Sequence, residues 1–178
     1  MTAIKNVFAI IGSASKNSAC LKLVQKIGEA TKNNLVINIF DTLNELPHFD
    51  PELSVANTPQ SILNFRNEVS KADAILICTP EYIFSIPSAL KNAIEWCVST
   101  TVFSNKPIGL ITASLSGIKA HEELQLIMKT VQTNFTEATT LLIQAVKSKL
   151  DADGNITDVK TSNDVDNFTK AFIELANK

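Results

Sequence analysis

The amino-acid sequence predicts an α/β domain in which helices cover both faces of a five-stranded parallel sheet. Short apolar runs alternate with helical patterns five times along the 178 residues, and this alternation is typical of a doubly wound sheet. One run, Ala74–Thr79, is apolar almost throughout, as expected for a parallel strand buried on both faces. The length corresponds to one domain over residues 1–178, which can bury a core without disulfides or metals.

The strands are expected at the apolar runs Lys5–Ile11, Leu35–Phe40, Ala74–Thr79, 107–113 and 140–146. Apolar residues at helical spacing predict a helix over residues 18–32 and four more after Pro59, after Pro87, around residues 124–131 and around residues 165–175. Residues 41–57 are expected to form a long loop, and residues 151–155 a hairpin turn rather than a calcium loop.

Composition excludes several function classes. A net charge of −2 without any block of like charges argues against a nucleic-acid partner and against a membrane-surface patch. No apolar run is long enough to span a membrane, and no signal peptide is recognised, so the protein is expected in the cytoplasm. The three cysteines form no CxxC pair and fit a reducing compartment. Only two histidines are present, and no metal site is expected.

Two loops at the predicted carboxyl edge of the sheet could carry chemistry, because ligands of such sheets bind beyond the carboxyl ends of the strands. The loop over residues 12–18 reads GSASKNS and runs from a buried strand into a helix. Backbone N–H groups at a helix N-terminus favour an anion, although a Ser-rich helix cap is the alternative. The loop is neither a Walker loop nor a dinucleotide fingerprint. The second loop, residues 79–87, could hold a planar ring or could be a rigid connector between two prolines.

The two loops resemble those of the NADPH-dependent FMN reductase family, which includes quinone, azo-dye and chromate reductases. The family pattern is close to GS-x-R-x-x-S-x-N in the first loop and PEYN-x-S-x-P-x-x-LKNAIDW in the second. The run PEYIFSIPSALKNAIEW matches the second pattern at Pro80, Glu81, Tyr82, Ser85, Pro87, Leu90, Lys91, Asn92, Ala93, Ile94 and Trp96. The LPHFDP segment at residues 46–51 also resembles the family's loop after its second strand.

The resemblance implies a flavodoxin-like fold with strand order 2-1-3-4-5 and FMN as cofactor. It implies that the phosphate faces Ser13, Ser15 and Ser18, with Lys16 and Cys20 at neighbouring motif positions. It implies that the flavin ring lies against residues of the loops after the third and fourth strands: Pro80, Glu81, Tyr82, Ile83, Ser85, Ser114, Ser116 and Gly117. A homodimer or homotetramer with the flavin near the subunit interface is also implied.

The chain departs from the family pattern in both loops. Ser15 stands where the family has Arg, Cys20 where it has Asn, and Ile83 where PEYN has Asn. An Arg–phosphate contact is worth about 1.5–3 kcal/mol, so its loss predicts FMN binding weaker by roughly one to two orders of magnitude. Lys16 would offset part of this loss as a point charge.

Several motif residues have two interpretations. Tyr82 is expected to pack at the flavin edge or to be a core aromatic. Glu81 is expected to position a substrate or a partner chain, or to be a solvated carboxylate. Trp96 is expected in the core or an interface. His121 is expected on the solvent side of a first helical turn, with an approach to the flavin as the alternative. Lys91 and Asn92 are expected to serve packing.

These observations predict an FMN-dependent NAD(P)H oxidoreductase that passes hydride from NADPH or NADH to flavin and on to a quinone-like or other small acceptor. No catalytic side chain is required, because the flavin supplies the chemistry. One alternative is a relative that binds FMN with little turnover. The other is a flavodoxin-like module that has lost tight FMN binding and acts as a binding or interaction protein.

Overall fold

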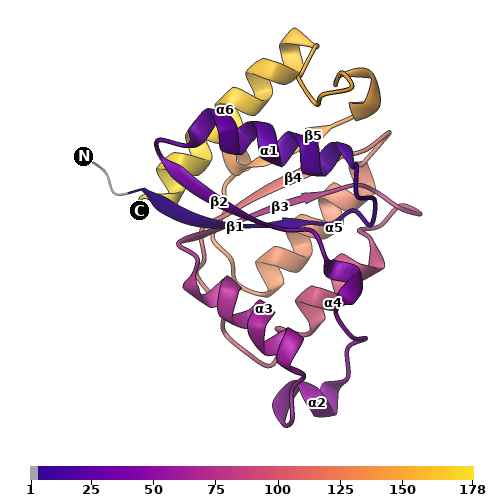
Figure 1. Ribbon diagram of the computed structural model, residues 1–178, viewed down its shortest axis with the longest axis vertical. Coiled ribbons are helices and arrows are strands. Elements are labelled where there is room, and N and C mark those ends of the chain that lie inside the picture. The colour runs from indigo at the N-terminus through magenta and orange to yellow at the C-terminus, as the bar shows by residue number, and fades with distance from the viewer. Residues whose placement is uncertain (1–3) are drawn as a thin grey trace.

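The sheet has the predicted number of strands, direction and order. The computed structural model describes residues 4–178 and contains one parallel sheet of order β2-β1-β3-β4-β5 (Figure 1). Its strands are β1 (Lys5–Ile11), β2 (Leu35–Phe40), β3 (Ala74–Thr79), β4 (Ile108–Ala113) and β5 (Thr140–Ile143). The neighbouring inner strands β3 and β4 are buried at every position, which explains why their apolar runs show no alternation.

Helices follow the strands as the spacing of apolar residues predicts. They are α1 (Ala19–Thr31), α2 (Pro51–Val55), α3 (Gln60–Lys71), α4 (Ser88–Glu95), α5 (Ile118–Thr130) and α6 (Val159–Ala176). Within residues 4–178, three 3-10 turns lie between strands and helices: η1 (Leu43–Glu45), η2 (Glu137–Thr139) and η3 (Val146–Ser148).

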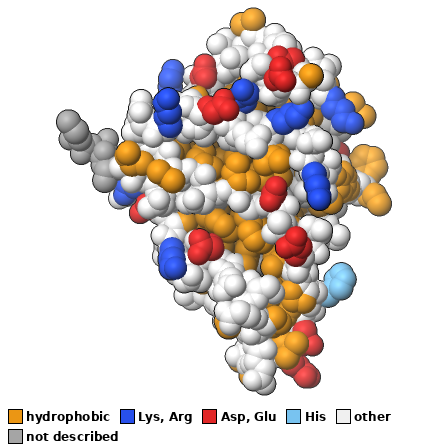
Figure 2. Space-filling model, in the orientation of Figure 1, with side chains coloured by type: hydrophobic (Ala, Val, Ile, Leu, Met, Phe, Trp, Pro, Cys, Tyr) orange, Lys and Arg blue, Asp and Glu red, His pale blue; other side chains and the backbone are white. Residues whose placement is uncertain are grey.

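Two helical layers enclose the sheet. Helices α1 and α6 pack on one face, and α3, α4 and α5 pack on the other (Figure 1). The outer edge of β2 stays open to solvent, and Val36 and Ile39 are partly exposed there. In the same orientation, hydrophobic side chains form a band across the middle of the molecular face (Figure 2). This arrangement leaves the carboxyl ends of the strands free to build a site.

Residues 41–57 are not a plain loop, which corrects the prediction. They contain η1 and the short helix α2, whose N-cap Asp50 accepts hydrogen bonds from the N–H groups of Glu52 and Leu53. Pro51 occupies the first helical turn, where a missing N–H costs nothing. The Asp50-Pro51 pair therefore marks the start of a helix. A proline favours an extended backbone at the residue before it, and here that residue is the N-cap Asp50.

The fifth strand is shorter than predicted. It ends at Ile143 because Ala145 takes a left-handed conformation, with φ of 51°, and turns the chain. The turn predicted at residues 151–155 is confirmed by the antiparallel bridge between Leu150 and Ile156.

Two residues of the PEYIFSIPSALKNAIEW run hold the preceding loop in place. The fully buried Trp96 donates its Nε1–H to the Pro47 carbonyl at 2.8 Å. Asn92 donates to the same carbonyl at 2.9 Å and accepts from the Phe49 N–H at 2.7 Å. The core position expected for Trp96 and the packing role expected for Asn92 are therefore confirmed, and Lys91 forms an ion pair with Glu95.

Within residues 4–178, no helix combines the length and the apolar character needed to cross a membrane. The three cysteines are buried and unpaired as disulfides. Burial raises the pKa of the Cys78 thiol, which keeps this side chain protonated in the core.

Candidate functional site

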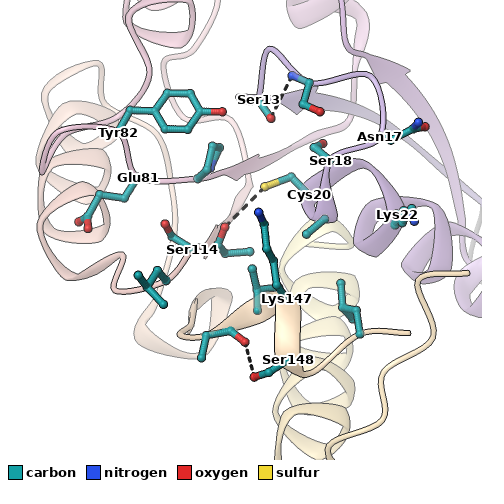
Figure 3. Close-up of a pocket in the computed structure, with 18 of the residues that line it drawn as sticks. Ser13, Asn17, Ser18, Cys20, Lys22, Glu81, Tyr82, Ser114, Lys147 and Ser148 are labelled. Carbon is teal, nitrogen blue, oxygen red and sulfur yellow. Dashed lines mark hydrogen bonds between the residues drawn. The ribbon is translucent and has the colours of Figure 1, made fainter. Parts of the chain in front are cut away.

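A cavity of about 800 Å³ opens at the carboxyl edge of the sheet (Figure 3). Its walls come from four segments, within residues 13–22, 80–82, 113–115 and 145–151. Volumes of about 300–1,000 Å³ are usual for small-molecule sites. The cavity therefore lies where the fold class places a ligand, and it is large enough for a cofactor.

The first loop supplies unsatisfied donors to this cavity. Two of its three hydroxyls are used internally: Ser13 accepts from the Ser15 N–H at 3.2 Å, and Ser18 caps α1 by accepting from the Leu21 N–H at 3.1 Å. Across the described part of the chain, the N–H groups of residues 16–20 find no protein acceptor. Such N–H groups at the positive end of a helix favour a bound anion.

The loop after β3 presents an aromatic side chain to the cavity and a strained turn to solvent. Tyr82 lines the cavity and is 47% exposed, which excludes the core-aromatic interpretation. Tyr82 and Ser85 form a bridge whose two central residues, Ile83 and Phe84, have φ values of 51° and 56°. Glu123 fixes the end of the turn by accepting from the Ser85 hydroxyl at 2.7 Å and the Ile86 N–H at 2.9 Å.

The turn explains the family preference for Asn at position 83. Asn tolerates a left-handed backbone, whereas a β-branched residue such as Ile does not. Ile83 is 96% exposed and does not line the cavity. Hydrophobic side chains protrude at the right of Figure 2, where the loop after β3 lies in Figure 1. Ile in place of the family's Asn at position 83 therefore adds strain to the turn and leaves the lining of the cavity unchanged.

Ile83→Asn is expected to stabilise the protein by about 1 kcal/mol, because it relieves part of the left-handed strain without removing buried surface. The thermal midpoint should rise by about 2–4 °C. Thermal unfolding followed by circular dichroism measures the change. Leu115→Asn is the control, because Leu115 is an exposed loop residue without positive φ. Equal midpoints for wild type and Ile83→Asn would contradict the strain argument.

Glu81 connects the loop after β3 to helix α5. One carboxylate oxygen accepts from the Gly117 N–H at 3.0 Å. The other accepts from the N–H groups of Lys119 at 2.9 Å and Ala120 at 3.0 Å. The carboxylate thus caps α5 and complements its dipole. Neither expectation for Glu81, substrate positioning or solvation, describes this contact.

His121 is half-buried, so the solvent-facing position expected for it is wrong. Its Nδ1 lies 2.9 Å from the Thr112 hydroxyl at the end of β4. Burial lowers the pKa of His121, and the nearby Glu122 opposes that effect only in part. The folded protein therefore favours the neutral imidazole.

The lowered pKa of His121 predicts that stability decreases in mild acid. In the unfolded chain the histidine takes up a proton below its ordinary pKa, near 6.5, whereas the folded protein resists this protonation. The contribution of His121 to the free energy of unfolding is therefore complete above that pH and is lost as the pH falls through the folded pKa. Urea unfolding between about pH 5 and 8 measures the trend. His121→Gln should flatten it, whereas His48→Gln, at an exposed residue, should not. An unchanged slope in His121→Gln would refute the assignment.

The structure brings together only some of the site residues expected from sequence. Eight line the cavity: Ser13, Ser15, Ser18, Cys20, Pro80, Glu81, Tyr82 and Ser114. Five others do not line it: Lys16, Ile83, Ser85, Ser116 and Gly117. Cys20 is almost fully buried beside the cavity, with its Sγ 3.9 Å from the Ala113 carbonyl.

Sequence reasoning missed the wall formed by residues 145–151. This segment includes Lys147, Ser148 and Asp151, and it faces the first loop across the cavity (Figure 3). The Asp151 carboxylate accepts from the N–H groups of Asp153 and Asn155 and from the Asn155 side chain. Lys22 of α1 donates to the Ala152 carbonyl at 2.6 Å and fastens the wall to the first helix. No sequence signal marked these residues as neighbours of the first loop.

Comparisons with known proteins identify the relatives of this chain. The family model described as NADPH-dependent FMN reductase matches residues 5–156. The chain is 28% identical over 117 residues to an NAD(P)H-dependent FMN reductase of Pseudomonas aeruginosa, covering 63% of each protein. It is 32% identical over 139 residues to an NADH-dependent flavin reductase subunit of Lactobacillus johnsonii, covering 69% of this chain and 74% of that protein. The match to an Arabidopsis thaliana NADPH:quinone oxidoreductase, at 31% identity, covers 62% of this chain and 59% of that protein.

Solved structures agree in fold. The flavoenzyme NAD(P)H:(acceptor) oxidoreductase FerB of Paracoccus denitrificans superimposes with a TM-score of 0.83 and 27% identity, covering 97% of each chain. An archaeal flavodoxin superimposes with a TM-score of 0.61 at 12% identity, covering 96% of each chain, and shows the fold alone. The chain spans about three-fifths of the length of several curated relatives.

Proposed function

This chain belongs to the NADPH-dependent FMN reductase family, and on that premise we propose that it is an FMN-dependent NAD(P)H oxidoreductase. The observation that carries the proposal is the cavity of about 800 Å³, which joins the free N–H groups of the first loop to an apolar and aromatic wall. A ligand with a phosphate at one end and a planar ring at the other matches this arrangement.

The residues divide into two groups by their chemistry. Ser13, Ser15 and Ser18 would surround the phosphate with the N–H groups that follow them. Pro80, Tyr82, Ser114 and Leu115 would lie against the ring. When bound, the flavin supplies the acceptance of hydride from a nicotinamide and its delivery to an acceptor. The protein contributes binding, orientation and the exclusion of water.

The two carboxylates of the cavity are compatible with an anionic cofactor. Glu81 accepts three N–H groups of the loop before α5 and its first turn, and Asp151 accepts donors from its own turn. Hydrogen bonds from N–H groups offset part of each negative charge. The carboxylates therefore hold the walls, and the N–H groups that they accept reduce the repulsion between them and a phosphate.

The substrates and the assembly are part of the proposal. The electron donor is NADPH or NADH, and the acceptor is a quinone or another small oxidant in the cytoplasm. Arg66 donates to the Trp96 carbonyl and to Ser54, so the single arginine serves packing between α2, α3 and α4. The 2′-phosphate that distinguishes NADPH would then need a lysine. The active form is a homodimer or homotetramer of single-domain chains, residues 1–178.

An FMN titration followed by flavin fluorescence tests the proposal, with NAD(P)H oxidation measured on the same sample with a quinone acceptor. Ser15 lines the cavity, and its side chain makes no hydrogen bond within residues 4–178, so it offers a matched pair of variants. Ser15→Asp places a negative charge at the phosphate position, whereas Ser15→Asn has the same shape without the charge. We expect saturable binding that Ser15→Asp weakens at least tenfold and Ser15→Asn does not.

Saturable binding with flavin-dependent turnover would support the reductase. Saturable binding with turnover at background would favour a protein that holds FMN without reducing it. Absence of binding at high FMN would refute the proposal and favour a flavodoxin-like binding module.

A further inference from the structure

We propose that Lys147 supplies the cation for the flavin phosphate that the first loop of this chain lacks. The inference rests on the proposed function and names a residue that neither the motifs nor the comparisons assign. Where the family has Arg in the first loop, this chain has Ser15. Lys147 reaches the same cavity from the opposite wall, about 130 residues further along the chain.

The backbone of Lys147 is held at the cavity by bonds to the neighbouring loop. The Ala145 N–H donates to the Leu115 carbonyl at 3.0 Å, and the Val146 N–H donates to the Ser114 carbonyl at 3.2 Å. Val146 is buried in the core, and the Ser148 hydroxyl closes the turn on the Ala145 carbonyl at 2.8 Å. The segment after β5 is therefore fixed to the loop after β4, and the Lys147 side chain begins from a rigid position.

The side chain extends across the cavity toward the first loop. Figure 3 shows Lys147 rising from the segment after β5 with its ammonium directed toward Cys20, next to Ser18. Within residues 4–178, the Lys147 ammonium has no hydrogen-bond or ion-pair partner. Within the described residues, the N–H groups of residues 17–20, on the facing wall, also lack acceptors. A phosphate between the two walls would satisfy both sets of donors.

The other cations are less suited to this role. Lys22 lines the cavity, but its ammonium is used by the Ala152 carbonyl at 2.6 Å. Lys16, expected from the sequence to compensate for the missing Arg, does not line the cavity. Arg66 is bound to carbonyl groups near α2 and α4. Lys147 is thus the cavity-lining cation whose charge is available to a ligand.

The test compares FMN with riboflavin, which has the same ring but no phosphate, on wild type, Lys147→Met and Lys147→Arg. Fluorescence titrations give both dissociation constants without any turnover. Lys149→Met is the control, because it removes the same charge from the same segment at a residue that does not line the cavity. We expect Lys147→Met to weaken FMN roughly ten- to hundredfold and to leave riboflavin unchanged. Lys147→Arg should restore most of the affinity.

Each other outcome has a definite meaning. Equal FMN affinity in wild type and Lys147→Met would overturn the role of Lys147 while leaving the proposed function intact. Equal losses for FMN and riboflavin, or the same FMN loss in Lys149→Met, would also overturn it, since the effect would not depend on a phosphate contact. Failure of the wild-type protein to bind either flavin would refute the proposed function itself.

Discussion

Gly12→Ala is expected to destabilise the protein by about 2–3 kcal/mol. Gly12 directly follows β1, and its N–H donates to the Cys78 carbonyl of β3 at 2.8 Å. A Cβ built at Gly12 would lie 2.3 Å from Thr79 Oγ1 and 2.6 Å from Thr79 Cβ. Thr79 is fully buried, so the clash can be relieved only by moving the end of β1 away from β3. Overpacking of a close-packed interior typically costs 1–3 kcal/mol.

The displacement would also reach the candidate site, because Ser13 and Ser15 follow directly on Gly12. We therefore expect FMN affinity to fall together with stability. Urea unfolding measures the first effect and flavin titration the second. Gly28→Ala is the matched control: its Cβ would meet nothing closer than 3.8 Å, and Ala is favoured over Gly within α1 by about 0.5–1 kcal/mol. Unfolding of Gly12→Ala at the wild-type urea concentration would show that the two strand ends do not constrain each other.

Glu81→Ala is expected to destabilise the protein by about 2–3 kcal/mol. The substitution removes three bonds from the carboxylate to the N–H groups of Gly117, Lys119 and Ala120 and leaves the first turn of α5 without its cap. Loss of an N-cap costs about 0.5–2 kcal/mol of stability. Hydrogen bonds to a charged group contribute more to stability than hydrogen bonds between neutral groups. The residue is partly exposed, which keeps the expected loss below the sum of three separate bonds.

Urea unfolding at neutral pH measures the effect of Glu81→Ala. Glu81→Gln should give a smaller loss, since it keeps one oxygen acceptor and gives up the charge. Glu122→Ala removes the same charge from the exposed face of α5, where the ion pair with Lys119 is screened by solvent and contributes little. A loss for Glu81→Ala no larger than that for Glu122→Ala would contradict the capping role.

Local sequence patterns predicted the sheet and most of the helices, because burial constrains the residues of a strand or helix position by position. The burial of β3 was visible in the AILICT run, because a strand covered on both faces needs apolar side chains at nearly every position. The helix α3 was visible in Ile62, Phe65 and Val69, which share one buried face. Helix α2 was missed because five residues give too little periodicity, although Asp50-Pro51 contained its start signal.

The candidate site was only partly predictable. The loop of residues 12–18 and Tyr82 could be recognised, because strand ends and helix starts are local features of the chain. The roles of Glu81 and His121 could not: Glu81 finds its partners 36 to 39 residues away, and His121 contacts Thr112 across the end of β4. Such contacts depend on how the loops meet after the helices have packed.

The alternation of strands and helices, the family resemblance and the loop that offers its N–H groups to an anion are all visible in the sequence. Which segments face that loop depends on how distant parts of the chain pack together. Residues 145–151 reach it because β5 pairs with β4 and the chain then turns at Ala145 onto the loop after β4. Parallel pairing brings strand ends that are distant in the chain to one edge, and no local pattern records that proximity.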